Sequence, residues 1–100
     1  MIVIYVAVNT QDHTAAEFER IIREIQADVR QMEGCVKNEW FCDPDIPLRY
    51  VMYGEFDSPA TFEKYLNSAI VKRIGDELMP LLAAPPEFKH YSAAIFDGNG

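Results

Sequence analysis

Hydrophobic and polar residues recur along the chain with two periods, and the change of period divides it into strands and helices. Residues 2–8, IVIYVAV, are β-branched or aromatic, which predicts a first strand that ends at about Asn9. Thr14 and Glu17 have the spacing of a capping box, which predicts the start of a helix. The apolar residues that follow recur at helical spacing over about five turns: Phe18, Ile21, Ile22, Ile25, Val29 and Met32.

The polar face of this first helix carries charges of both signs, and the pattern predicts that they are solvated: Glu19, Arg20, Arg23, Glu24 and Arg30. Gly34, just past the last apolar residue, suits a left-handed helix stop. Two strands are expected next, at about residues 35–42 and 48–56. Pro44 and Pro47 exclude regular strand pairing in the residues that connect these two strands, which leaves a connecting turn of about five residues.

A second helical region is expected after the third strand. Ser58 can cap a helix whose first position is Pro59. An apolar stripe then extends through a further short helix, until Pro80 ends or distorts it: Phe62, Tyr65, Leu66, Ile70, Ile74, Leu78 and Leu81. A last strand is expected at residues 88–96, before a polar tail at residues 97–100.

The order βαββαβ predicts an α+β fold of the ferredoxin-like type, with helices on one face of a four-stranded antiparallel sheet. Residues 2–6 are apolar at successive positions, which predicts burial on both faces of the sheet. A second copy that packs its sheet against the first would bury the face without helices, and we therefore expect a homodimer. One domain should span residues 1–100, with its core in residues 2–96.

Composition and charge narrow the class of partner. Hydrophobic residues make up 49% of the chain and charged residues 25%, which is typical of a folded globular protein. A net charge of -7 without a basic cluster argues against binding to nucleic acid. Residues 2–8 are too few to cross a membrane, and Cys35 and Cys42 fit free thiols in a reducing compartment. The sequence predicts a cytoplasmic protein with no nucleic-acid or membrane partner.

Strong catalytic motifs are missing from the sequence. It has no Gly-rich phosphate loop, nucleophile elbow, C-x-x-C or H-E-x-x-H. Asp43 and Asp45 do not supply enough oxygen ligands for a hard cation, and they are common turn formers, so no metal site is expected. Any catalysis should therefore depend on a shaped pocket.

Residues 34–68 carry a family resemblance. They read GCVKNEWFC, DPDIP, LRYVMYGEF and DSPATFEKYLNS, which predicts a hairpin that leads into a capped helix. In this order, within residues 2–96, the chain resembles the antibiotic biosynthesis monooxygenase family of dimeric α+β barrel proteins. The resemblance implies a homodimer through the sheet face. It also implies oxidation of a small aromatic, quinol or polyketide-like substrate by molecular oxygen, without a metal, a flavin or another cofactor.

The resemblance directs attention to a mostly apolar pocket with a few polar side chains. We expect Asn9 and Tyr65 to be catalytic, with Asn9 as a donor to a substrate oxygen, although Asn9 is equally typical of a turn. The expected substrate-binding residues are Asn38, Trp40, Tyr53 and His90. Asn38 and Trp40 share one face of their strand, and Tyr53 shares a face with Glu55, but the sequence leaves open which faces meet the helices.

Alternatives remain at this point. The haem-degrading branch of the family has a Trp near the position of Tyr65 and a His soon after it, and the sequence NSAIVKRIGDEL contains no His. This departure argues against haem degradation and favours, as an alternative, a non-catalytic small-molecule-binding or stress-related dimer with the same fold. A third possibility, an isomerase or lyase, would need a base with a raised pKa in the pocket.

Overall fold

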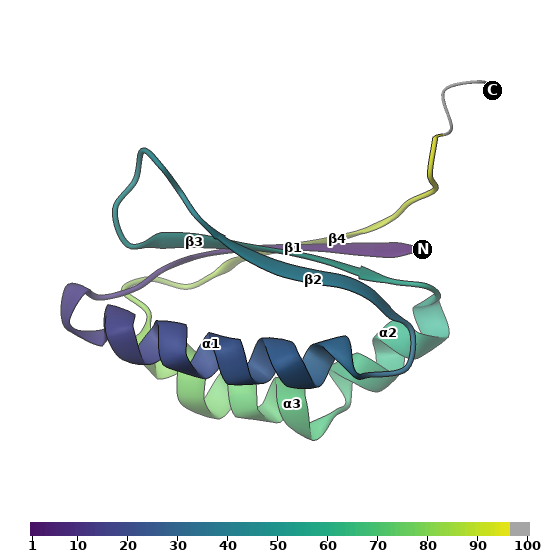
Figure 1. The fold of residues 1–100 in the computed structure, drawn as a ribbon, viewed down its shortest axis with the longest axis horizontal. Coiled ribbons are helices and arrows are strands. Elements are labelled where there is room, and N and C mark those ends of the chain that lie inside the picture. The colour runs from purple at the N-terminus through teal and green to yellow at the C-terminus, as the bar shows by residue number, and fades with distance from the viewer. Residues whose placement is uncertain (97–100) are drawn as a thin grey trace.

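The computed structural model describes residues 1–96, and the polar tail expected at 97–100 lies outside the described residues. Four strands and a series of helices follow the predicted order (Figure 1). The elements are β1 (Ile2–Asn9), η1 (Asp12–Thr14), α1 (Ala15–Arg30), β2 (Cys35–Cys42), β3 (Arg49–Phe56), α2 (Pro59–Leu66), α3 (Ala69–Arg73), η2 (Ile74–Leu78), η3 (Met79–Leu81) and β4 (Glu87–Ser92). Most element boundaries lie within one or two residues of those expected.

The strands form one antiparallel sheet in the order β2-β3-β1-β4, and the helices lie together on one of its faces (Figure 1). This is the predicted α+β, ferredoxin-like arrangement. The register aligns residues in rows across all four strands, so that Trp40, Met52, Val6 and Phe88 form one such row. Because side chains of paired residues point to the same face, each row belongs either to the helix side or to the open side.

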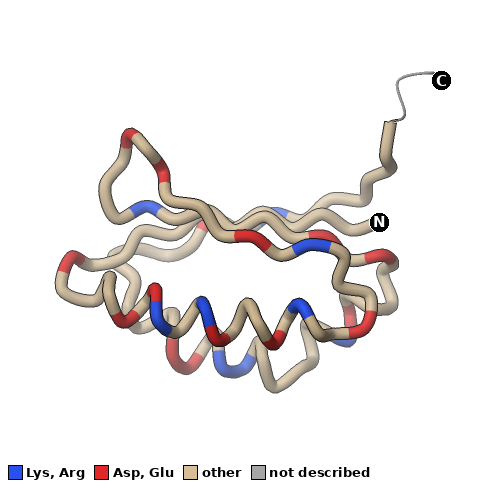
Figure 2. The backbone as a smooth tube through the Cα atoms, viewed as in Figure 1, with Lys and Arg blue, Asp and Glu red and all other residues tan. Residues whose placement is uncertain are grey.

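The core lies between the sheet and the helices. Apolar residues of α1 pack at helical spacing against alternate residues of the strands, as the sequence predicts: Phe18, Ile21, Ile22, Ile25 and Val29 with Ile2, Ile4, Val8, Tyr50, Met52 and Phe56. Acidic and basic residues alternate along the helices (Figure 2) and pair one turn apart, as Arg20 does with Glu24. The helix surface away from the sheet is therefore polar.

The last strand is shorter than expected. It was predicted over residues 88–96, whereas β4 ends at Ser92. Its partner explains the difference, because Ser92 pairs with Ile2 at the very start of β1 and Ala93 donates to the carbonyl of Met1 at 2.8 Å. The end of β4 thus coincides with the start of β1.

The predicted capping box at the start of α1 is wrong. The Thr14 side chain makes no capping hydrogen bond to the helix, and its hydroxyl instead donates to the carbonyl oxygen of Leu81 at 2.7 Å. The competing interaction is tertiary, since η3 passes next to the first turn of α1. Ser58, in contrast, caps α2 as predicted, because its Oγ accepts from the amide of Thr61 at 3.2 Å.

Two residues with positive φ set the ends of the central hairpin. Gly34 has a φ of 82°, the left-handed conformation expected there. Leu48 has a φ of 65°, so that β3 begins at Arg49 rather than at Leu48. The turn between the strands is closed by Asp43, whose Oδ1 accepts from the amides of Asp45 and Ile46, the local role that Asp plays in turns.

Replacing Gly34 by alanine should lower the free energy of unfolding by more than about 1 kcal/mol, because of both its conformation and its surroundings. A Cβ at this position would overlap the side chains of Thr61 and Asp57. Gly75→Ala is the matched control, since a Cβ there meets nothing within 4 Å. Urea denaturation of both variants gives the comparison, and equal stabilities would contradict the argument.

Candidate functional site

A cavity of about 310 Å³ lies between the sheet and the helices. Its floor is the row of Trp40, Met52, Val6 and Phe88, to which all four strands contribute. Apolar residues of α1 and of the segment from Tyr65 to Met79 form the opposite wall, among them Ile25, Val29, Val71, Ile74 and Leu78. The cavity is of the size and character that small organic ligands occupy in proteins.

The π-helical turn η2 forms part of this wall. Ile74, Gly75 and Leu78 all line the cavity. Such turns occur mostly as single interruptions of α-helices and are frequent at functional sites. Gly75 is exposed to solvent, as are Leu66 and Phe88, which indicates that the cavity opens at their side of the molecule.

Within residues 1–96, three of the residues that line the cavity carry an oxygen or nitrogen atom in the side chain: Asn38, Trp40 and Tyr65. All three are among the expected site residues. Asn38 and Trp40 come from β2, two residues apart, and both face the helices. The other lining side chains, where present, are aliphatic, aromatic or thioether groups.

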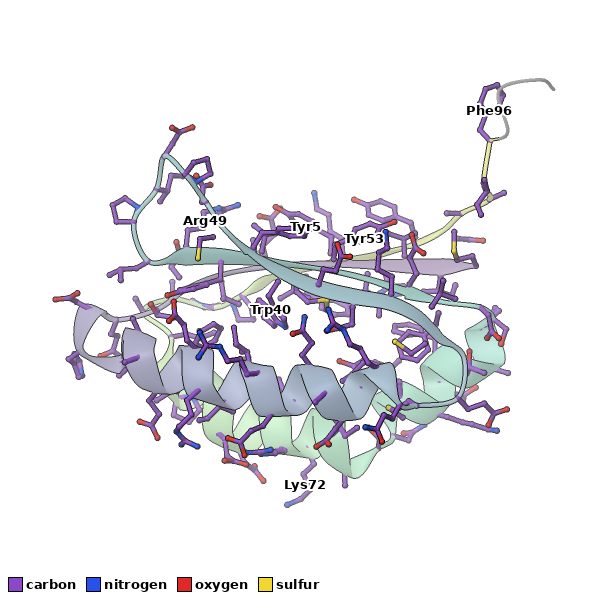
Figure 3. All side chains as sticks on the ribbon, viewed as in Figure 1. Tyr5, Trp40, Arg49, Tyr53, Lys72 and Phe96 are labelled. Atoms are coloured by element: carbon purple, nitrogen blue, oxygen red, sulfur yellow. The ribbon has the colours of Figure 1, made fainter. Side chains whose placement is uncertain are left out.

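Tyr53 lies on the other face of the sheet from this cavity. In Figure 3 Tyr5 and Tyr53 point away from the helices, whereas Trp40 points toward them. The Tyr53 hydroxyl donates to Glu55, and its ring lines a shallow depression on the open face together with Val3, Tyr5 and Tyr91. The strand alternation that the sequence left open thus separates Tyr53 from Asn38 and Trp40.

Asn9 and His90 also do not line the cavity. Asn9 shares its strand parity with Tyr5, on the open face, and its carbonyl accepts from the amide of Ala83 at 2.8 Å. His90 lies on the helix side, with its ring centre 5.4 Å from that of Phe62 and 5.6 Å from that of Phe88. It therefore borders the aromatic cluster beside the cavity but remains exposed.

Asn38 is the most unusual polar group of the site. Its side chain is only 5% exposed, its Nδ2 donates to the thioether sulfur of Met52 at 3.5 Å, and its Oδ1 is buried without a hydrogen-bond partner. A buried carbonyl without a partner costs about 1–3 kcal/mol. Because Asn38 is among the residues that line the cavity, this oxygen is a candidate acceptor for a ligand that carries a donor.

The backbone of Asn38 is held from α1. Gln26 Nε2 and Arg30 Nε each donate to its carbonyl oxygen at 3.0 Å. Gly54 lies directly opposite in β3, and a Cβ there would crowd the acceptor of the Asn38 amide, because it would lie 3.3 Å from Met52 Sδ. The prediction that Arg30 is merely solvated is therefore incomplete, since Arg30 and Gln26, one helical turn apart beside the apolar stripe, fix the edge strand that carries Asn38.

Tyr65 is suited to donate a proton in a hydrogen bond rather than to remove one. Its ring packs against Phe56 at 5.1 Å and Phe62 at 6.3 Å between ring centres. Burial, with a smaller contribution from Cys35, raises the pKa of Tyr65 to about 12. The phenol is protonated near neutral pH, as an unshifted tyrosine is, and the raised pKa extends this state to higher pH, so that it can donate to a ligand oxygen that carries negative charge.

The sequence profile of the family described as antibiotic biosynthesis monooxygenase matches residues 1–77. The chain belongs to this family. The matched part contains β1, α1, β2, β3, α2 and α3, and thus Asn38, Trp40 and Tyr65. No curated protein matches the chain in sequence.

Solved structures share the family fold at low sequence identity. A protein from Deinococcus radiodurans assigned as an antibiotic biosynthesis monooxygenase has a TM-score of 0.89 at 18% identity, covering 96% of this chain and 95% of its own. One from Caulobacter crescentus with the same assignment has a TM-score of 0.88 at 20% identity, covering 94% and 90%. A conserved protein of Methanosarcina mazei has a TM-score of 0.85 at 18% identity, covering 90% and 89%.

Two further observations concern metal binding and membrane-spanning helices. Within residues 1–96, no group of three or more His, Cys, Asp or Glu side chains is arranged to hold a metal ion. The helices of the same part of the chain are too short or too polar to cross a membrane.

Asn38→Leu should raise the free energy of unfolding of the ligand-free protein by about 1–2 kcal/mol, because it replaces a buried acceptor without a partner by an apolar side chain of similar size. Thr61→Val is the control. Thr61 is also buried, but its hydroxyl donates to Asp57 at 2.7 Å, so its loss should destabilise the protein. Chemical denaturation compares both with the wild type, and destabilisation by Asn38→Leu would show that Oδ1 is satisfied in solution.

Proposed function

We propose that the cavity binds a small aromatic quinol or polyketide-like molecule and that the protein is a monooxygenase that oxidises this molecule with molecular oxygen. The observation that carries the proposal is the buried Oδ1 of Asn38, which has no partner in an otherwise apolar cavity. A hydroxyl group on a flat aromatic ring satisfies both conditions, since it donates to the amide while the ring contacts the apolar walls.

The two polar ends of a quinol match the two kinds of polar group that line the cavity. One hydroxyl donates to Asn38 Oδ1, and the other, once ionised, accepts from the Tyr65 hydroxyl. Trp40 and Phe88 offer ring faces or edges to the aromatic system between them. The chain thus holds the quinol in one orientation and excludes water from it.

The chemistry then needs no other reductant. The quinolate gives electrons to dioxygen, one oxygen atom bonds to a ring carbon, and that carbon loses its hydrogen. The second oxygen atom leaves as water, so that a quinol and O₂ become a hydroxyquinone and H₂O in a balanced four-electron oxidation. Because the quinol is the electron donor, neither a metal nor a flavin is required, which agrees with the family resemblance.

A binding protein without catalysis is the second candidate. This second candidate is favoured because, within residues 1–96, no Asp, Glu, His or Lys side chain lines the cavity. Without such a base, the quinol must lose its proton to the solvent before or during binding. Both candidates predict binding, and they differ in oxygen consumption.

We further propose that the protein acts as a homodimer, as members of the family generally do, and that it is cytoplasmic. The open face of the sheet carries aromatic side chains, of which Phe41 is 52% and Tyr91 51% exposed. Aromatic and charged side chains alternate on this face, and a second copy is the partner that it suits, because exposed aromatic surface in water is unfavourable. The reducing compartment is inferred from Cys35 and Cys42, both of which are free.

Oxygen consumption with a panel of quinols tests the catalytic proposal. We expect saturable uptake, reduced at least about tenfold by Asn38→Leu and by Tyr65→Phe, since each removes one hydrogen bond to the substrate. Asn9→Ala and Tyr53→Phe, outside the cavity, should retain the wild-type rate. The rate should rise with pH through the pKa of each quinol. Calorimetric binding without oxygen uptake would establish the second candidate instead.

The dimer is tested separately by light scattering at micromolar concentration. We expect a dimer for the wild type and for Tyr53→Phe, which keeps the aromatic surface. Tyr53→Glu should give a monomer, because it places a third carboxylate beside Glu55 and Glu39 at the centre of the open face. A wild-type monomer would rule out this assembly.

A further inference from the structure

A second, smaller hollow of about 200 Å³ lies along the groove between α1 and the edge strand β2. Its lining is more polar than that of the cavity and includes Glu19, Arg23 and Gln26 of α1. On the strand side it is lined by Phe41 and Cys42 of β2 and, from β3, by Tyr50. Among the described residues, Trp40 is the one that lines both this groove and the cavity.

Trp40 belongs to a group of three packed aromatic rings between the cavity and the groove, Trp40, Phe18 and Tyr50, which we call the aromatic partition. The Trp40 indole makes a T-shaped contact with Phe18, which lines the cavity, with ring centres 5.7 Å apart. Phe18 in turn contacts Tyr50, which lines the groove, at 5.0 Å. The Tyr50 hydroxyl donates to Glu19 at 2.9 Å, and this hydrogen bond ties the partition to α1.

We propose that Trp40 is the specificity-determining residue that limits the size of the aromatic ligand, because its indole closes the cavity toward the groove between α1 and β2. This inference rests on the proposed binding of aromatic hydroxyl compounds. The indole is the largest side chain of the chain's cavity floor, and replacing it by a small one would join the two spaces. Ligands with more fused rings would then fit without a change in the helices or the sheet.

The test compares 2-naphthol, with two fused rings, and 1-hydroxypyrene, with four, by isothermal titration calorimetry. The wild type should bind 2-naphthol and bind 1-hydroxypyrene more weakly. Trp40→Ala should bind 1-hydroxypyrene about tenfold more tightly than the wild type does, because the extra rings bury apolar surface in the joined space. Trp40→Phe, which removes one ring of the indole and disturbs folding less, should give a smaller gain.

Two control variants distinguish the loss of the Trp40 indole from a general enlargement of the cavity. Met79→Ala widens the cavity at a residue that does not line the groove, so it should give no gain for 1-hydroxypyrene. In the Trp40→Ala background, Cys42→Phe refills the groove from an exposed position on β2 and should cancel the gain. Circular dichroism establishes that each variant is folded.

The outcomes distinguish this inference from the proposed function. If the wild type binds 2-naphthol but neither Trp40 variant gains affinity for 1-hydroxypyrene, or if Met79→Ala gains as much, the role of Trp40 is refuted and the cavity remains a ligand site. If the folded wild type binds neither compound, nor any quinol of the oxygen-uptake panel, the proposed function fails and the inference fails with it.

Discussion

Pairing in register across the four strands is the constraint on which the rest of this structure depends. Because paired residues point to the same face, the row of Trp40, Met52, Val6 and Phe88 faces the helices as one unit and becomes the floor of the cavity. The adjacent row with Tyr5 and Tyr53 faces the open side for the same reason. A shift of one residue in the register of β2 would exchange Asn38 and Trp40 for Glu39 and Phe41. The contacts of Gln26 and Arg30 with the Asn38 carbonyl help to hold that edge strand in place.

The sequence was sufficient for the fold, because strong local signals agreed with one another. Apolar residues at helical spacing, the Ser58 cap and the left-handed Gly34 each depend on neighbouring residues alone, and each is found as predicted. Predictions went wrong where a distant segment intervened. The Thr14 hydroxyl donates to the carbonyl of Leu81, 67 residues away, instead of capping its own helix, and β4 ends at Ser92, opposite the first residue of β1.

The site was harder to predict than the fold, for a reason that lies in the strands. Sequence spacing showed that Asn38 and Trp40 share a face, but not which face the helices cover, and β1, which is apolar at successive positions, gives no alternation that would decide it. Half of the six expected residues, Asn38, Trp40 and Tyr65, therefore line the cavity, whereas Asn9, Tyr53 and His90 do not. Gln26 and Arg30 were missed, although their spacing of one turn beside the apolar stripe was a usable signal.

The energetics of Asn38 connect this geometry to function. A buried carbonyl without a partner lowers stability, and a leucine would fit an apolar core at no such cost. Tyr65, a phenol whose pKa burial raises further above neutral, is among the lining residues, and within the described residues the lining contains no Asp, Glu, His or Lys. These features suit a ligand that brings its own hydrogen-bond donor and its own acidic proton. An aromatic quinol has both, and its electrons are the only ones that the proposed reaction with oxygen needs. In the proposed function, the protein's part is to bind, orient and desolvate a molecule that is already reactive.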